Sequence, residues 1–292
     1  MFVLPHKEVL ATIHLAHHFQ SAFTVDQVYR YLRIRISREQ FESILKNLKD
    51  RDLIFEKNAV LFTRDLQKSY LQKKRCSKDI FRRHKRYLSI IARMPWVKYV
   101  ALTGANAFES CQTRDDVDLF LVTKGNRLWI CYLALVLFSK AIRKRDTLCI
   151  NYLVDEQNLH IRQHDYYTAV QILQMIPLFD SDFNKKIIED NPWIFDFLPN
   201  ACPQLAKDRF YLLRNGYHKP ENKAEQSGFF SRLNRVIYEK YSRRLSGKYP
   251  REFGKGIVLG EGLAKLNRIN HQDIYEEIYQ KIYREIQTTL SI

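Results

Sequence analysis

Two acidic residues at the start of an apolar strand constrain this chain more than any other feature. The segment from Tyr99 to Thr123 is typical of a strand, a tight turn, an irregular segment and a second strand. Because side chains alternate between the faces of a strand, Asp116 and Asp118 share one face, and Val117 faces the other way. Desolvated carboxylates need cations, and hard oxygen ligands at this spacing suit Mg²⁺ or Mn²⁺ bridged to substrate phosphates. We therefore expect a metal site at Asp116 and Asp118.

The turn after the first strand has the backbone freedom that phosphate binding requires. We predict a strand over 97–103 that ends at Gly104, and glycine permits the tight path that lets a phosphate approach the backbone closely. Arg127 is the one cation directly after the acid-bearing strand. Its side chain either contacts phosphate or lies along a helix start, and the sequence leaves both interpretations open.

A family resemblance connects these features. The polymerase-β-type nucleotidyltransferases carry a signature that is similar to Leu102-Thr103-Gly104-Ala105, ten further residues and Asp116-Val117-Asp118-Leu119. Three other stretches resemble a little-characterised bacterial branch with an N-terminal winged helix: Asn126-Arg127-Leu128-Trp129, Leu148-Cys149-Ile150-Asn151-Tyr152 and Asn191-Pro192-Trp193-Ile194. The resemblance implies transfer of a nucleoside monophosphate from a nucleoside triphosphate to an unknown acceptor hydroxyl. It also implies that Asp116 and Asp118 are catalytic and hold two metal ions, while the Gly104 turn holds the triphosphate.

The turn departs from the family pattern at one position. Ala105 stands where the superfamily usually has serine, so one hydroxyl donor to phosphate is missing. Thr103 or Asn106 could take its place. The expected nucleotide-binding set is therefore Thr103, Gly104, Ala105, Asn106 and Arg127.

A second departure concerns the third carboxylate, which in the superfamily usually lies on a later strand. Here the best candidate strand presents Asn151, which we expect on one face with Cys149 and Leu153. An amide accepts a hydrogen bond or weakly ligates a metal, but it is a poor general base. Asn151 is therefore either the third catalytic residue or a satisfied buried amide. Asp146 and Asp155 are rivals for the missing acid.

Charge and composition restrict the partners. A net charge of +16 over 292 residues favours a polyanion: a nucleoside triphosphate, a nucleic acid such as tRNA or DNA, or an anionic surface. The alternative explanation of the positive charge is that the lysine residues only keep the protein soluble. The five cysteines form no CxxC pair, and with no signal peptide this predicts free thiols in a reducing cytoplasm. The longest apolar run, 128–138, is too short to cross a bilayer, so we expect no membrane partner.

The first part of the chain has the element order of a winged helix. Helices are expected to begin at three points, the last two at capping boxes: Lys7, Thr24 with Gln27, and Ser37 with Gln40. Residues 52–55 and 60–63 can then pair as a hairpin. In a DNA-binding version the third helix enters the major groove, but its outward residues are mixed in charge. Packing against the rest of the chain or a partner protein is the other interpretation.

A strongly basic helix is expected over 64–94, ended by Pro95. It either attracts triphosphate or a polynucleotide backbone at the site, or forms a solvated face. Among its cations are Lys73, Lys74, Arg75, Lys78, Arg82, Arg83, Lys85, Arg86 and Arg93.

The predicted fold class is α/β, with a minimal nucleotidyltransferase core, an N-terminal winged-helix domain and a helical C-terminal domain. The expected domains are 1–65 for the winged helix, 66–95 for the basic connecting helix, 96–180 for the core and 181–292 for the helical domain. A helix is expected over 164–180, and 216–228 is a candidate linker. The rival function is a catalytically degraded core that binds nucleotide or nucleic acid as a regulator, because Ala105 and Asn151 depart from the family pattern.

Overall fold

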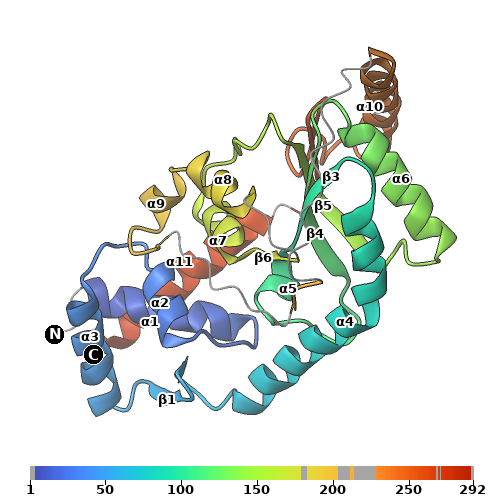
Figure 1. The fold of residues 1–292 in the computed structure, drawn as a ribbon. Helices are drawn as coiled ribbons and strands as arrows, with labels where there is room; N and C mark the ends of the chain where they lie inside the picture. Colours follow the sequence, from blue (N-terminus) through green and yellow to red (C-terminus); the bar gives the residue numbers. More distant parts are fainter. Residues whose placement is uncertain are drawn as a thin grey trace.

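The computed structural model describes residues 4–178, 183–202, 211–213, 228–267, 269 and 271–290 (Figure 1). Its helices are α1 (Leu4–His18), α2 (Val25–Tyr31), α3 (Arg38–Asp50), α4 (Gln67–Arg93), α5 (Gly104–Ala107), α6 (Leu128–Ala141), α7 (Tyr166–Gln174), α8 (Phe183–Glu189), α9 (Ile194–Phe197), α10 (Gly228–Lys248) and α11 (His271–Leu290). Its strands are β1 (Phe55–Lys57), β2 (Val60–Phe62), β3 (Val97–Leu102), β4 (Val117–Thr123), β5 (Leu148–Asp155), β6 (Ile176–Pro177), β7 (Ile257–Gly260) and β8 (Leu263–Leu266). Residues 216–227 of the predicted linker lie outside the described part.

A mixed six-stranded sheet forms the centre, in the order β6-β3-β4-β5-β8-β7. Strands β4 and β5 are parallel, and the other neighbouring pairs are antiparallel. The connection between the parallel strands is α6, as parallel pairing requires a crossover. The predicted α/β class is confirmed at this level.

Helices cover both faces of the sheet. Figure 1 shows α6 and α10 along one side, and α7 and α8 on the other. The alternation along β4 explains the two layers, because Val117 and Leu119 belong to the apolar cluster beneath α4, α6 and α10. Phe120 and Val122 belong to the opposite cluster, which extends to α7, α8 and α11. The side chain of Asp118 lies on the same face of the sheet as that of Phe120, at the end of the apolar packing on this face.

The N-terminal unit has the expected element order of three helices and a hairpin, and both capping boxes form. The hairpin is displaced from the predicted pairing, because its turn is Asn58-Ala59 and its strands are β1 and β2. Both turn residues have positive φ, because a two-residue turn with this conformation matches the right-handed twist of the two strands. Helix α1 packs against α11, so the two ends of the chain support one another.

The C-terminal part of the chain is not purely helical, and that expectation was wrong. Strands β7 and β8 form a hairpin that adds to the sheet beside β5. The helix expected over 164–180 also ends early, at Gln174, and β6 pairs with β3 at the other side of the sheet. These strands have only two to four residues, too few for an alternating pattern to stand out.

The longest apolar run of the sequence forms a core helix, α6. Trp129 is fully buried in it. Its ring N–H donates to the Gly260 carbonyl at 2.8 Å, and its backbone N–H donates to the side-chain oxygen of Asn234. Both partners come from the C-terminal part, which therefore locks onto the sheet through α6. Within the described ranges, no helix combines the length and apolarity that crossing a membrane requires.

Asn191 is a buried polar clamp. Its side-chain oxygen accepts from the Ile161 N–H at 2.7 Å and the Trp193 ring N–H at 3.0 Å. Its amide group donates to the carbonyls of Leu159 and Ile187. Asn191 therefore joins three segments around α8 and α9, and its side chain is fully used in the fold.

Replacing Asn191 by alanine should destabilise the protein by about 2–4 kcal/mol, because four buried partners lose their hydrogen bonds. Urea unfolding measures this free energy. The matched control is Asn200→Ala, since Asn200 is only half-buried and bonds the backbone of Ile34 and Ile36. An equal loss in both variants would contradict the clamp role.

Candidate functional site

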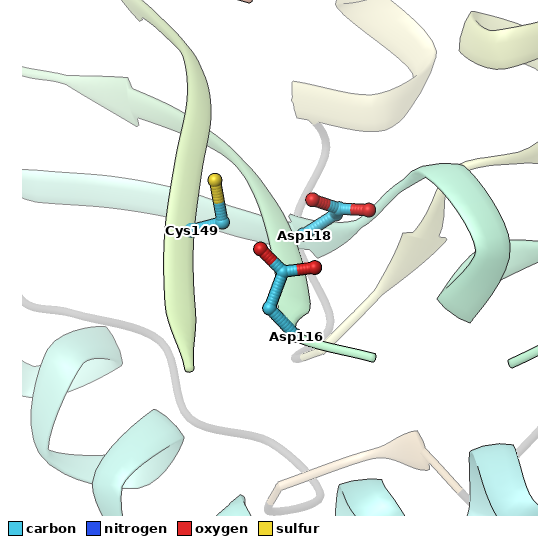
Figure 2. A group of neighbouring side chains, drawn as sticks. All are labelled: Asp116, Asp118 and Cys149. Atoms are coloured by element: carbon cyan, nitrogen blue, oxygen red, sulfur yellow. The ribbon is translucent and has the colours of Figure 1, made fainter. Parts of the chain in front are cut away.

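Two carboxylates and a thiol meet where β4 and β5 begin. Asp116 directly precedes β4, Asp118 is its second residue, and Cys149 is the second residue of β5. Figure 2 shows the three side chains gathered at this point, and their ligand-type atoms all lie within 4.8 Å of one another. Asp118 pairs with Cys149 in the parallel register, which accounts for their closeness.

The turn between β3 and α5 lies directly against Asp118. The backbone N–H of Thr103 donates to the Asp118 carbonyl at 3.1 Å, and Asn106 donates its amide to the Asp116 carbonyl at 2.9 Å. Gly104 has a φ of +58°, and a Cβ there would lie 2.5 Å from the Asp118 carboxylate oxygen Oδ2. Glycine is therefore required both by the backbone angle and by the space. Asn106 is buried and holds the backbone, so its amide is already committed.

Asn151 contacts the site through Asp118. Its amide donates to Asp118 Oδ1 at 2.5 Å, and its own oxygen accepts from the Cys149 thiol at 3.1 Å. The expectation that Leu153 shares this face was wrong, because the register between β4 and β5 shifts after Leu119 and Leu153 packs in the opposite cluster. The irregularity places Tyr152, next to Asn151, on the same face instead, where its ring stacks on Phe120.

The two rival acids do not join the cluster. Asp155 pairs with Thr123 at the carboxyl ends of the parallel strands, about 17 Å along β4 from Asp118. There its carboxylate accepts from the Gln157 N–H and the Asn158 amide, so it shapes a loop. Asp146 lies exposed in the loop before β5 and is not part of the carboxylate and thiol group. Among the described residues, no third carboxylate joins Asp116 and Asp118.

Arg127 also lies away from the acids. It follows β4, whose amino end carries Asp118, so the length of the strand separates the two. Its guanidinium lies over the rings of Trp96 and Phe230 and donates to the Asn126 carbonyl at 2.8 Å. Of the two interpretations, this placement favours packing at the start of α6.

One residue at the turn had not been expected. The side-chain oxygen of Gln171, from α7, accepts from the Gly104 N–H at 3.1 Å and the Thr103 hydroxyl at 3.2 Å. These two groups are the donors that we expect to bind phosphate, and in this structure the Gln171 side chain occupies them. Ala105 faces the opposite way, against the apolar cluster of α4 and α6, so its missing hydroxyl leaves no gap at the turn.

Side chains from β8 and α11 lie on the same face of the sheet. The sequence pattern predicted neither these side chains nor strand β8. Lys265 pairs with Tyr152, and its ammonium donates to the side-chain oxygen of Gln163. Tyr167 of α7 stacks on His271 with ring centroids 6.3 Å apart. Burial raises the pKa of Tyr167, and the Asp118 charge adds to this, so α7 lies close to the acids.

Burial and the repulsion between the two carboxylates raise the pKa of Asp118. Burial raises the pKa of Asp118 to about 7, and the charge of Asp116 adds to this, while the Asn151 hydrogen bond opposes it. Burial likewise raises the pKa of the Cys149 thiol to about 12. Near neutral pH, the thiol is therefore protonated and the cluster offers carboxylate oxygen as its charged ligand.

Comparison with known proteins leaves the site to be interpreted from its own geometry, since no family model, curated protein or solved structure matches the chain significantly.

Replacing Asp118 by asparagine should stabilise the metal-free protein increasingly as pH rises. The folded protein releases this proton near pH 7, whereas the unfolded chain releases it near pH ~3.9. Between these values the folded state holds a proton that the unfolded state has lost, so wild-type stability falls by up to about 1.4 kcal/mol per pH unit. The loss is absent below the lower value and complete above the upper one.

Thermal melting in chelator across this pH range measures the effect. The difference in melting temperature between Asp118→Asn and wild type should grow from acid to neutral pH. Asp146→Asn, at an exposed carboxylate of the same sheet edge, should instead follow the wild type. Parallel curves for Asp118→Asn and wild type would show that Asp118 ionises normally.

Proposed function

We propose that the protein is a metal-dependent nucleotidyltransferase, which moves a nucleoside monophosphate from a nucleoside triphosphate to an acceptor hydroxyl. The observation that carries this proposal is the contact between the Gly104 turn and Asp118, which would bring a phosphate bound at the turn next to a metal bound by the acids. The sheet order, with antiparallel β3 and β4 and parallel β5, supports it. In the reaction, the acceptor oxygen bonds to the α-phosphorus, the bond to the β-phosphate oxygen breaks, and pyrophosphate leaves.

The donor set fits Mg²⁺ or Mn²⁺. Asp116 and Asp118 supply carboxylate oxygens within reach of one ion, and hard oxygen ligands suit these metals. The protonated Cys149 thiol is a poor ligand for them. Bound here, the metal would supply charge neutralisation at the phosphates and activate the attacking oxygen.

The turn supplies neutral donors for the triphosphate. Gly104 N–H and the Thr103 hydroxyl converge on one oxygen, that of Gln171. A phosphate oxygen at that point would receive the same two hydrogen bonds, once the Gln171 side chain turns away. The backbone donor is fixed by the fold, so it needs no reorganisation when charge develops.

A second candidate is a degraded core that binds nucleotide or nucleic acid as a regulator. The observation that favours it is the amide of Asn151 on Asp118, where the superfamily usually has a carboxylate. An amide cannot remove the proton of an acceptor hydroxyl. The two candidates share nucleotide binding and differ in transfer.

Nucleoside triphosphate binding should require Mg²⁺ or Mn²⁺ and both acids. In calorimetry, Asp116→Asn/Asp118→Asn should weaken metal-dependent binding by at least about tenfold, because the cation loses both charged ligands. Asp146→Asn, a matched charge change outside the cluster, should bind like the wild type. Unchanged binding in the double variant would refute the metal site.

Transfer itself is tested by incubating the protein with each α-labelled triphosphate, Mn²⁺, and separate RNA, protein and metabolite fractions. Label that becomes acid-stable in one fraction identifies the acceptor, and the double variant provides the background. Metal-dependent binding without any transfer would favour the regulator.

Asn151→Asp should strengthen metal binding and raise transfer, because a carboxylate there adds an oxygen ligand and a base. Without metal the same variant should lose stability, since a third negative charge replaces an amide that donates to Asp118. Calorimetry and melting with and without Mn²⁺ measure both effects. Unchanged metal affinity together with unchanged stability would place Asn151 outside the working site.

A further inference from the structure

A basic loop borders the two acids. Residues 142–147 connect α6 to β5 and contain Arg143, Lys144 and Arg145 in succession. The loop is held by its backbone: the Lys144 N–H donates to the Ser139 carbonyl at 2.8 Å, and the Val117 N–H donates to the Thr147 carbonyl at 2.7 Å. The second bond ties the loop to the residue between the acids.

The loop lies beside the acid cluster. Arg145 is exposed two residues before Thr147, whose carbonyl holds the N–H of Val117, the residue between the two acids. Cys149, two residues after Thr147, lies within 4.8 Å of both carboxylates.

The second half of α4 continues the basic surface. His84 faces inward with its pKa lowered by burial first, and then by Lys144 of the loop and by Arg83. Arg83 and Arg86 are exposed one turn apart on α4. In Figure 1, the chain that leaves α6 returns to the sheet near α4. We name the exposed or half-exposed residues Arg83, Arg86, Arg143, Lys144 and Arg145 the basic strip.

Some cations elsewhere on α4 pair with acids, whereas those of the strip do not. In the first half of α4, Lys74 and Lys78 lie 3.2 and 4.0 Å from the Glu109 carboxylate. Within the described part of the chain, none of the strip residues lies within 4.0 Å of a carboxylate oxygen. Clustered like charges repel one another, and an anionic partner would relieve this repulsion.

The N-terminal unit gives the contrast. Arg30 and Arg38 both pair with Asp26, and Lys49 of α3 pairs with Glu56. Ion pairs therefore engage cations of α2 and α3, the helices that a winged helix would direct at DNA. Among the described residues, Lys46 is the one cation of α2 and α3 without such a pair, whereas all five cations of the strip are without one.

We propose that the basic strip binds the phosphate backbone of a single-stranded nucleic acid, whose 3′-terminal hydroxyl reaches Asp116 and Asp118. A single strand fits because a half-buried acceptor site admits a chain end more readily than a duplex. The role of the 3′-hydroxyl rests on the proposed function, whereas backbone binding by the strip does not. Each phosphate contact releases counterions, so binding is strongest at low salt.

Fluorescence anisotropy with a labelled oligoribonucleotide of about 20 nucleotides, over a salt series, tests the strip. Arg143→Gln/Lys144→Gln/Arg145→Gln should raise Kd about tenfold or more and reduce the slope of log K against log salt by about 2, since each lost contact contributes about 0.7. Lys46→Gln/Lys49→Gln/Lys57→Gln removes the same charge from the N-terminal unit and should change neither value appreciably. Melting temperatures verify that both variants fold.

Three results would overturn the inference: no binding by the wild type at low salt, equal affinity of the strip variant and the wild type, or loss of binding only in the N-terminal variant. Calorimetry with Mg²⁺ and triphosphate separates this failure from failure of the proposed function. If the protein binds triphosphate but no oligoribonucleotide, the proposed function stands and the proposed role of the strip is refuted. If the protein binds the oligoribonucleotide through the strip but no triphosphate, the proposed role of the strip stands and the proposed function is refuted.

Discussion

The close approach of the Gly104 turn to the Asp118 carboxylate is the constraint on which the site depends. A side chain at position 104 would lie 2.5 Å from a carboxylate oxygen and its residue would have a strained positive φ, so glycine fits the end of β3 best. The Thr103 N–H bond to the Asp118 carbonyl fixes the same junction from the backbone side. The donors of the Gly104 turn and the Asp118 carboxylate are therefore held together by one tight contact between neighbouring strands.

The sheet around that junction is completed from distant parts of the chain. Strand β6 borders β3, and the β7–β8 hairpin borders β5, so the acid-bearing strand is central. A central strand buried on both faces places its first polar position under strong desolvation, which is why the pKa of Asp118 rises to about 7. The burial of Asp118 on its own face, together with the charge of Asp116, thus sets the chemistry of this carboxylate.

The sequence was sufficient where the signals are local. The strand with alternating acids, the capping boxes at Thr24 and Ser37 and the apolar helix α6 all depend on residues a few positions apart. It was insufficient where tertiary contacts decide. The register shift after Leu119 moved Leu153 off the expected face, and Gln171 reaches the Gly104 turn from a helix whose pattern marked only its apolar side. Short strands such as β8 carried no pattern.

Charge balance connects the acids with the basic surroundings. Asp116 and Asp118 together carry two negative charges when ionised, and the amide of Asn151 adds none, so one divalent ion neutralises the cluster. A triphosphate that enters with its own Mg²⁺ still carries excess negative charge, as does a nucleic-acid end. Neither would be attracted by a site that a resident ion has only made neutral. Under the proposed function the positive field comes from outside the carboxylate cluster, and the loop of the basic strip, tied to Val117 through Thr147, lies at that border.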